Sequence, residues 1–330
     1  MPSASGGLPI KSMSVQHHKE RPSTLPAFSA SFLMPKYWLI WIGLFLFYCL
    51  SWLPTKVIDA FANYLGDAAF TKNKKRFAIA KTNLQLCFPD KSDDEINEMA
   101  YEHFRAQARA YLQYARLWWH PASLLKKRIE VVGLEQVEAV KAKGENVIIL
   151  LCHSVSLDVA IAALSMRIKS SGPYKPVRSP LINWLLANRR VRFGGIIFTR
   201  EDGLRPLIKS IRSDRVLIYL ADEDLGGSSR CVFTPFYGVQ KATVPVLGRL
   251  AKTTHSKVFA CISCYDSGRS KYVVKVLPCI QNLNGEDDLA DTRAMNSAIE
   301  QAVDHCRSQY LWTLRLFQTR PENEPPVYKS

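Results

Sequence analysis

Acidic residues are scarce relative to basic ones in this chain. Its 330 residues contain 29 Asp and Glu against 44 Lys and Arg, which gives a net charge of +15. This imbalance favours an acidic partner, such as nucleic acid, an anionic membrane surface or a polyanionic substrate. A hydrophobic fraction of 47% excludes a disordered chain, and the length is sufficient for one large domain or two ordinary ones. No internal repeats are found, which argues against a repeat architecture.

Paired cysteine motifs are also nearly absent. The eight cysteines stand at irregular intervals, and Cys261 with Cys264 forms a C-x-x-C motif that has neither a second pair nor a nearby histidine to complete a zinc site. Because both lie in the apolar stretch KVFACISCYD, the sequence favours two cysteines in a strand. We expect reduced thiols and a cytosolic location for most of the chain.

Long uncharged hydrophobic runs are rare, with one exception near the N-terminus. Tyr37 to Leu53 gives 17 residues without a charge, the lower limit for a helix that spans a membrane. Its Tyr and Trp residues cluster toward the ends, as in helices that contact lipid headgroups. A cleaved signal peptide fits poorly, because the run starts late and lacks a small-residue cleavage site. We therefore predict a membrane-anchoring helix over residues 36–54, either as a single transmembrane helix or lying in one leaflet.

The segments on either side of this helix differ in composition. Residues 1–35 are rich in Ser, Pro and Gly and are predicted to form a disordered tail. Residues 55–128 are predicted to be helical and close to the membrane. Within them, Ser92 and Glu95 form a capping box ahead of a helical apolar pattern that Pro121 ends. Five basic residues at 72–81 suit an anionic membrane surface, although a solvated helical face would have the same composition.

From residue 129 onward, short apolar runs alternate with helical stretches. This alternation predicts an α/β fold with a mixed, largely parallel central sheet flanked by helices. The predicted strands are 129–132, 147–152, 195–199, 216–221, 258–263 and 272–277, and the predicted helices are 134–143, 157–168, 181–190, 204–212, 244–253 and 289–310.

The strand predicted at 147–152 leads into LCHSVSLDVA, which carries His153 and, five residues later, Asp158. A buried charge without a partner is costly, so this pair has to be used or satisfied. The two side chains can meet only if His153 lies in a loop and Asp158 in the first helical turn, with Ser154 or Ser156 as the cap. A carboxylate would then orient an imidazole that takes a proton from a substrate hydroxyl. The alternative is a histidine that merely hydrogen-bonds a loop.

Four further stretches favour the functional interpretation. GGIIFTRED places Arg200 directly after a predicted strand, and IYLADEDLGGSSR places Asp222, Glu223 and Asp224 at the end of another, with Arg230 close behind. ATVPVLGRLA and QYLWTLRLFQTRP follow. This block order, with H-x4-D first, resembles that of the glycerolipid-type acyltransferases.

More closely, CFPD, PFYG at 235–238, DEDLGG and QYLWTLRLFQTRP are similar to the late acyltransferases of lipid A biosynthesis. These are the lauroyl and myristoyl transferases of Gram-negative inner membranes, and the resemblance runs from about Pro35 to Pro321. The chain departs from the family in one helix, because many members have a glutamate before LWW where this chain has AYLQYARLWW. A role for that glutamate therefore does not carry over.

The resemblance implies an O-acyltransferase that moves a lauroyl or myristoyl chain from acyl carrier protein to a hydroxyl of a Kdo-bearing lipid A precursor. Residues 129–330 would be the acyltransferase domain on the cytoplasmic side of the bacterial inner membrane, with 55–330 as one catalytic unit. By matching position, His153 would be the general base, Asp158 would hold its tautomer, and Arg200 would bind an acceptor phosphate or the oxyanion. Asp224, with Gly226–Gly227 and Arg230, would shape the pocket floor. The mechanism requires no metal and no cofactor.

A basic stretch supports the same partners. Residues 167–215 contain twelve basic residues against three acidic ones, a local net charge of +9 that suits an acidic carrier protein and a polyanionic acceptor. Arg189, Arg190 and Arg192 are candidate contacts to either partner, or else a solvated helix end. Nucleic acid is an unfavourable partner, because no recognisable binding module or interleaved stacking aromatics accompany the charge.

Two other functions are compatible with parts of the sequence. One is acylation of a different membrane lipid, such as lysophosphatidate or a mannosylated inositide, although PFYG and QYLWTLRLFQTRP argue against lysophosphatidate. The other is a catalytically inert membrane scaffold, against which the intact His153–Asp158 pair argues.

Overall fold

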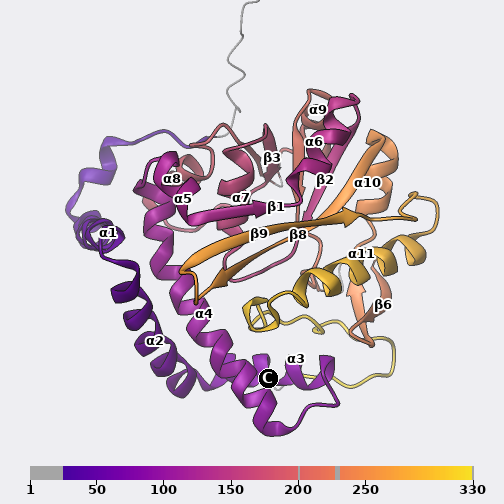
Figure 1. The fold of residues 1–330 in the computed structure, drawn as a ribbon, viewed down its shortest axis with the longest axis horizontal. Helices are drawn as coiled ribbons and strands as arrows, with labels where there is room; N and C mark the ends of the chain where they lie inside the picture. Colours follow the sequence, from indigo (N-terminus) through magenta and orange to yellow (C-terminus); the bar gives the residue numbers. More distant parts are fainter. Residues whose placement is uncertain (1–24, 200, 227–230, 329–330) are drawn as a thin grey trace, which may run out of the picture.

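The centre of the protein is a seven-stranded sheet with helices on both faces (Figure 1). The computed structural model describes residues 25–199, 201–226 and 231–328. Strands β8 and β9 are antiparallel, and the other neighbouring pairs are parallel. The order across the sheet is β1 (Ile129–Val132), β9 (Lys271–Cys279), β8 (Ser256–Asp266), β2 (Asn146–Leu151), β5 (Val216–Tyr219), β3 (Ser170–Pro173) and β4 (Ile196–Phe198). The predicted α/β fold with a mixed, largely parallel sheet is confirmed.

The sheet is buried on both faces, which explains the continuous apolar run of its central strand. Along β2, Ile148 and Leu150 point into one hydrophobic core, and Val147, Ile149 and Leu151 point into the other. The first core is covered by α3 (Lys74–Cys87), α4 (Asp93–Trp119), α9 (Leu204–Arg212), α10 (Leu247–Thr254) and α11 (Asp288–Val303). The second is covered by α5 (Ala122–Arg128), α6 (Leu134–Ala142) and α7 (Leu157–Ser165).

Some elements differ from the predicted ones. Helix α11 ends at Val303 rather than Tyr310, because Tyr310 pairs with Ser154 in an isolated β-bridge. Strand β3 has the sequence SSGP, which carries no apolar run, and was not predicted. The antiparallel hairpin of β6 (Val232–Phe236) and β7 (Val239–Thr243) was also missed, since Pro235 interrupts its first strand.

The helix ends show which local signals determine structure. Ser92 and Glu95 form the predicted capping box of α4, and this helix ends at Trp119, just before His120 and Pro121. Ser156 precedes α7, but its hydroxyl donates to the carbonyl of Ser263 at 2.9 Å instead of capping the helix. The capping prediction for α7 is therefore wrong, because the neighbouring strand offers a partner for the hydroxyl.

The cysteines also depart from expectation. Cys261 and Cys264 both lie in β8, as predicted, and Cys261 is free and buried. Cys264, however, forms a disulfide with Cys306, 42 residues further along the chain. The expectation of reduced thiols is wrong for this pair, which the irregular spacing did not indicate.

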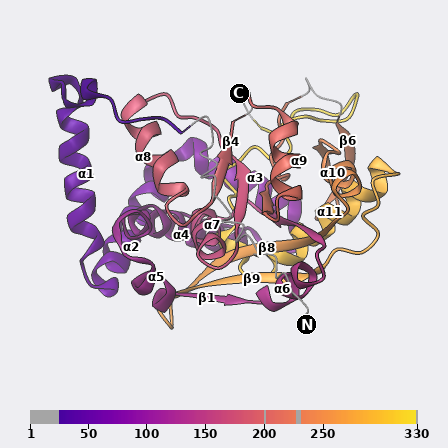
Figure 2. The same cartoon turned by 90° about the horizontal axis from the view of Figure 1, so that it is seen from above.

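The N-terminal helices lie at the outer edge of the molecule (Figures 1 and 2). Two short 3-10 helices at 30–33 and 35–37 precede α1 (Trp38–Ser51), and α1 and α2 (Thr55–Lys72) both pack on α4. Among the described residues, no helix is long and apolar enough to cross a membrane, so the predicted transmembrane helix is not found. Residues 1–24 of the predicted tail lie outside the described part of the chain, and the proposed domain boundaries stay predictions.

Candidate active site

His153 and Asp222 meet at the carboxyl ends of two neighbouring parallel strands. His153 follows β2 and Asp222 follows β5, and β2 and β5 pair side by side. Nδ1 of His153 lies 2.5 Å from Oδ1 of Asp222, and the backbone N–H of His153 donates to Oδ2 at 2.7 Å. Open α/β sheets characteristically place ligands at this edge.

The pair is buried and electrostatically coupled. The side chain of Asp222 is 0% exposed and that of His153 is 19% exposed. Burial by itself lowers the pKa of His153, but the charge and hydrogen bond of Asp222 outweigh it and raise this pKa above its ordinary value. Burial likewise opposes ionisation of Asp222, but the charge and hydrogen bonds of His153 lower its pKa to about 2. Asp222 therefore stays ionised, and the imidazole is the member of the pair that gains and loses a proton.

Asp158 does not orient His153 in the structure. Its carboxylate accepts two hydrogen bonds from Arg190 of α8 (Pro180–Arg190), Nε to Oδ1 at 2.8 Å and Nη2 to Oδ2 at 3.1 Å. The hydroxyl of Tyr114 on α4 donates to the same Oδ2. The predicted His153–Asp158 contact is thus replaced by His153–Asp222, because Asp158 points from the first turn of α7 toward α4 and α8.

A cavity lies beside the Asp158 cluster. It is a narrow crevice, partly open to solvent, and is lined by Asp158, Arg189 and Arg190 together with the apolar side chains of Leu117, Trp118, Ile161, Ala162, Leu186 and Phe193. A second, equally narrow crevice shares Ile161 and Arg190 with it and extends along β3, β4 and β5. Together they form a mainly apolar space under α8.

A buried lysine lies near the acidic member of the pair. Lys241 of β7 is 0% exposed, and within the described part of the chain its ammonium has no hydrogen-bond partner. It lies 5.7 Å from the ring centre of Phe236. Burial lowers the pKa of Lys241, and the charges of Asp222 and Asp224 oppose that shift. In return, Lys241 lowers the pKa of both Asp222 and His153.

Of the other predicted pocket residues, Asp224 and Gly226 form hydrogen bonds within the protein, and the rest lie outside the described part of the chain. Asp224 accepts from the backbone N–H of Gly226 at 2.9 Å and from the backbone and hydroxyl of Thr319 at 2.6 and 2.8 Å. It therefore fixes the turn after β5 to the C-terminal segment. Arg200, Gly227 and Arg230 fall on residues that the structure does not describe, so their predicted roles stay predictions.

The three candidate arginines differ in what surrounds them. Arg190 is paired with Asp158, and Arg192 donates to the carbonyls of Leu117, Trp118 and His120 at the end of α4. Arg189 lines the cavity, and burial lowers its pKa. Arg190 and Arg192 thus donate their hydrogen bonds to groups of the protein itself. Of the three arginines, Arg189 is therefore the best placed to contact a substrate.

The arrangement is suited to proton transfer. Asp222 accepts from Nδ1–H, so the lone pair on Nε2 of His153 is left for a substrate proton. Among the residues that the structure describes, no three His, Cys, Asp or Glu side chains are grouped so that they could hold a metal ion.

Sequence comparison shows which family the chain belongs to. The family model described as bacterial lipid A biosynthesis acyltransferase matches residues 25–319. The chain belongs to this family. One lipid A biosynthesis acyltransferase, from Haemophilus influenzae, is 34% identical over 90% of this chain and 93% of its own length. The lipid A biosynthesis myristoyltransferase of Escherichia coli is 31% identical over 94% of this chain and 96% of its own length. The lipid A biosynthesis lauroyltransferase of the same organism is 31% identical over 93% of this chain and 100% of its own length.

For this lipid A acyltransferase family member, sequence reasoning missed three contributors to the site. Asp222 was noted as part of an acidic block but not paired with His153, although both follow predicted strands whose ends meet if the strands are neighbours. Lys241 belongs to none of the patterns that the sequence shows, and Tyr310 was noted only as part of QYLWTLRLFQTRP, without a role in the site.

Proposed function

We propose that the protein transfers a fatty acyl group from acyl carrier protein to a hydroxyl of a Kdo-bearing lipid A precursor, with His153 as general base. The observation that carries this proposal is the His153–Asp222 pair, which leaves Nε2 free of Asp222 in a site at the carboxyl edge of the sheet. The names of the relatives, which include a myristoyl and a lauroyl transferase, support lipid A as acceptor and a lauroyl or myristoyl chain as the transferred group.

The chemistry would run as one proton cycle. Nε2 of His153 takes the proton of the acceptor hydroxyl while the hydroxyl oxygen attacks the thioester carbonyl, and Asp222 stabilises the imidazolium that forms. The new C–O bond forms as the C–S bond breaks, and the imidazolium returns its proton to the leaving thiolate. In this scheme Asp222 takes the role that the sequence pattern assigned to Asp158.

We place the acyl chain along the two narrow crevices under α8, whose walls would have to move apart to admit it. Their walls are formed mostly by apolar side chains, and burial of a hydrocarbon chain against such walls is favourable by about 0.8 kcal/mol per CH2. Asp158, five residues after His153, lines the first cavity. Arg189 at its wall would contact the acidic carrier or the acceptor.

We also propose that α1 attaches the protein to the inner membrane by lying in one leaflet, with the catalytic domain on the cytoplasmic side. Helix α1 has 14 residues and is therefore about 21 Å long, short of the roughly 30 Å of a hydrocarbon core. Large apolar side chains cover its outer surface, for example Leu39 at 82%, Phe45 at 64% and Leu46 at 62% exposed. Contiguous exposure of this kind marks a membrane or protein contact.

The function is tested by mass spectrometry of lipid A from a strain that lacks the protein. We expect the lipid A to lose the mass of one acyl chain and to regain it with the wild-type gene but not with His153→Ala. An unchanged lipid A contradicts the proposal. If another membrane lipid changes mass instead, the same chemistry acts on a different acceptor.

Membrane attachment is tested by flotation with vesicles that contain anionic phospholipid. Replacing Leu39, Phe45 and Leu46 together by Ser should release the protein from the vesicles without changing its melting temperature, because these side chains are exposed. A matched triple change to Ser at exposed uncharged polar positions, Thr71, Gln240 and Gln281, controls for the number of substitutions without changing the charge. Flotation that survives the apolar triple change would contradict attachment through α1.

A further inference from the structure

The segment Gln309–Leu311 touches both members of the His153–Asp222 pair. It belongs to QYLWTLRLFQTRP, a stretch to which the proposed reaction gives no task. Tyr310 is 0% exposed although it carries a hydroxyl, so this hydroxyl needs a partner inside the protein. Its partner is the carboxylate of Asp222.

The backbone of this segment holds the loop that carries His153. The N–H of Leu311 donates to the carbonyl of His153 at 2.8 Å, and the N–H of Val155 donates to the carbonyl of Gln309 at 2.8 Å. Between these two bonds, Ser154 and Tyr310 form an antiparallel bridge. The loop is thus fixed on both sides of Ser154 by a piece of chain more than 150 residues away in sequence.

The side chain of Tyr310 holds the other member of the pair. Its hydroxyl donates to Oδ2 of Asp222 at 2.9 Å, and the backbone N–H of His153 donates to the same oxygen. Oδ1 is left to face the imidazole. The ring of Tyr310 packs against Trp312 at 5.0 Å between ring centres. Because both oxygens are occupied, the carboxylate cannot rotate without breaking a hydrogen bond.

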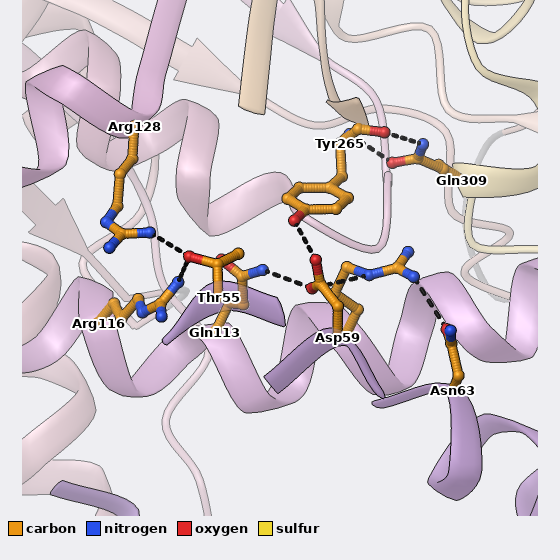
Figure 3. Close-up of polar contacts among 9 residues, drawn as sticks. Thr55, Asp59, Asn63, Gln113, Arg116, Arg128, Tyr265 and Gln309 are labelled. Carbon is orange, nitrogen blue, oxygen red and sulfur yellow. Dashed lines mark hydrogen bonds and ion pairs between the residues drawn. The ribbon is translucent and has the colours of Figure 1, made fainter. Parts of the chain in front are cut away.

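The segment is itself fixed from a third side. The side-chain amide of Gln309 accepts from the backbone N–H of Tyr265 at 2.7 Å and donates to its carbonyl at 2.9 Å. The hydroxyl of Tyr265 donates to Asp59 of α2 at 2.6 Å, and Figure 3 shows this path from Gln309 through Tyr265 to Asp59. The Cys264–Cys306 disulfide joins β8 to the stretch just before this segment.

We propose that Gln309–Leu311 is the positioning segment of the active site, which fixes the His153 loop and the Asp222 carboxylate in one mutual geometry. Tyr310 is the positioning residue for Asp222, and Gln309 fixes the segment to β8. This inference rests on the proposed role of His153 as general base. Neither residue touches the substrate in this scheme, so both act on the rate through the imidazole and not on binding.

Tyr310→Phe in the full-length protein tests the inference, because it removes the hydroxyl and keeps the ring. We expect kcat to fall on the order of 10-fold with KM unchanged, the size expected for one lost hydrogen bond to a charged group. The carboxylate, which stays ionised because its pKa lies near 2, would interact more strongly with the imidazolium. The pKa of the His153 imidazole, followed by NMR without substrate and assigned with His153→Ala, should therefore rise.

Two further variants complete the experiment. Gln309→Met keeps the side-chain length but loses both bonds to Tyr265, and it should also lower kcat at constant KM. Tyr237→Phe is the matched control, since its hydroxyl donates to Asp304 at 3.1 Å and to the carbonyl of Glu300 at 3.0 Å, outside the site. It should lose comparable thermal stability and keep the wild-type kcat and His153 titration.

The outcomes separate this inference from the proposed function. If Tyr310→Phe lowers only the melting temperature, as Tyr237→Phe does, and leaves kcat and the His153 titration unchanged, the positioning role is wrong. If His153→Ala still transfers acyl groups, the proposed function itself fails. A shifted imidazole titration in Tyr310→Phe would then still establish the geometric coupling of Tyr310 to the pair.

Discussion

Two buried aspartates in this protein are held in similar ways but by different partners. Asp222, 0% exposed, accepts from His153 and Tyr310, and Asp158, 8% exposed, accepts from Arg190 and Tyr114. Each combines one basic side chain with one tyrosine hydroxyl. The guanidinium of Arg190 keeps its proton at any physiological pH, and Asp158 raises its pKa further against the effect of burial. An imidazole can lose its proton near pH 7, so of the two clusters the one around Asp222 holds the basic side chain that can accept a proton.

The comparison teaches that sequence spacing does not identify the carboxylate that contacts His153. Asp158 is the acid of the H-x4-D pattern, yet its position in α7 directs it toward α4 and α8, where it neutralises a largely buried arginine. Asp158 lines the first crevice under α8, and Asp222 is the carboxylate that contacts His153.

The largest expected effect separates the two carboxylates directly. Asp222→Asn should lower kcat by about 10²–10⁴-fold, because the amide neither holds the imidazole tautomer nor stabilises the imidazolium. The double variant with His153→Ala should be little worse than His153→Ala alone, since the two residues act as a unit. Steady-state kinetics on detergent-dispersed acceptor would measure this. A similar loss in Asp158→Asn with a mild one in Asp222→Asn would reverse the assignment.

Asp158→Asn should act mainly on stability. Loss of charge-assisted hydrogen bonds to Arg190 should lower the free energy of unfolding by about 1.5–3 kcal/mol, with a much smaller change in kcat than in Asp222→Asn. Denaturant unfolding at neutral pH gives the first quantity. A variant of unchanged stability would show that the Asp158–Arg190 pair is not a structural contact.

The pH dependence sharpens the comparison further. Since Asp222 raises the pKa of His153, kcat/KM should rise with pH through one ionisation above the ordinary imidazole value of about 6.5. Lys241→Met removes a positive charge that lowers the pKa of His153, so the ionisation should move to higher pH. At pH values below this pKa, kcat should then fall several-fold with KM unchanged. Asp222→Asn should move the ionisation to lower pH. Profiles that coincide in all three proteins would contradict titration of His153 as the origin.

The smallest expected effect concerns substrate contact outside both clusters. Arg189→Ser should raise KM by about two- to fivefold with little change in kcat, the range expected for a partly exposed ion pair, and added salt should diminish the difference. Arg215→Ser, a change of the same charge at a residue bonded to the carbonyls of Ser170 and Gly194, serves as the comparison. Equal KM values in Arg189→Ser and the wild type at low salt would remove Arg189 from the substrate site.

Local patterns predicted much of the fold because they depend on neighbours in sequence. Helix α9 and strand β1 have the predicted bounds, and the capping box of α4 forms as its spacing requires. Strand β3 and the β6–β7 hairpin could not be predicted in this way. Strand β3 is extended because β5 offers it backbone partners, and β6 and β7 are extended because they pair with each other. The side chains of these segments do not indicate that such partners exist.

The sequence by itself determined that this is a basic α/β protein of the lipid A acyltransferase family, with His153 where a buried strand ends. Hydrophobic periodicity, caps and block order are enough for that, since each depends on residues close together in the chain. Only the tertiary structure decided that Asp222 contacts His153, that Tyr310 donates to Asp222 and that the charge of Lys241 acts on His153. It also decided that Asp158 pairs with Arg190. The physical reason is that strand order and side-chain direction bring these groups together. Asp222 is 69 positions from His153 and 88 positions from Tyr310 in the sequence, separations at which residue spacing carries no information about contact.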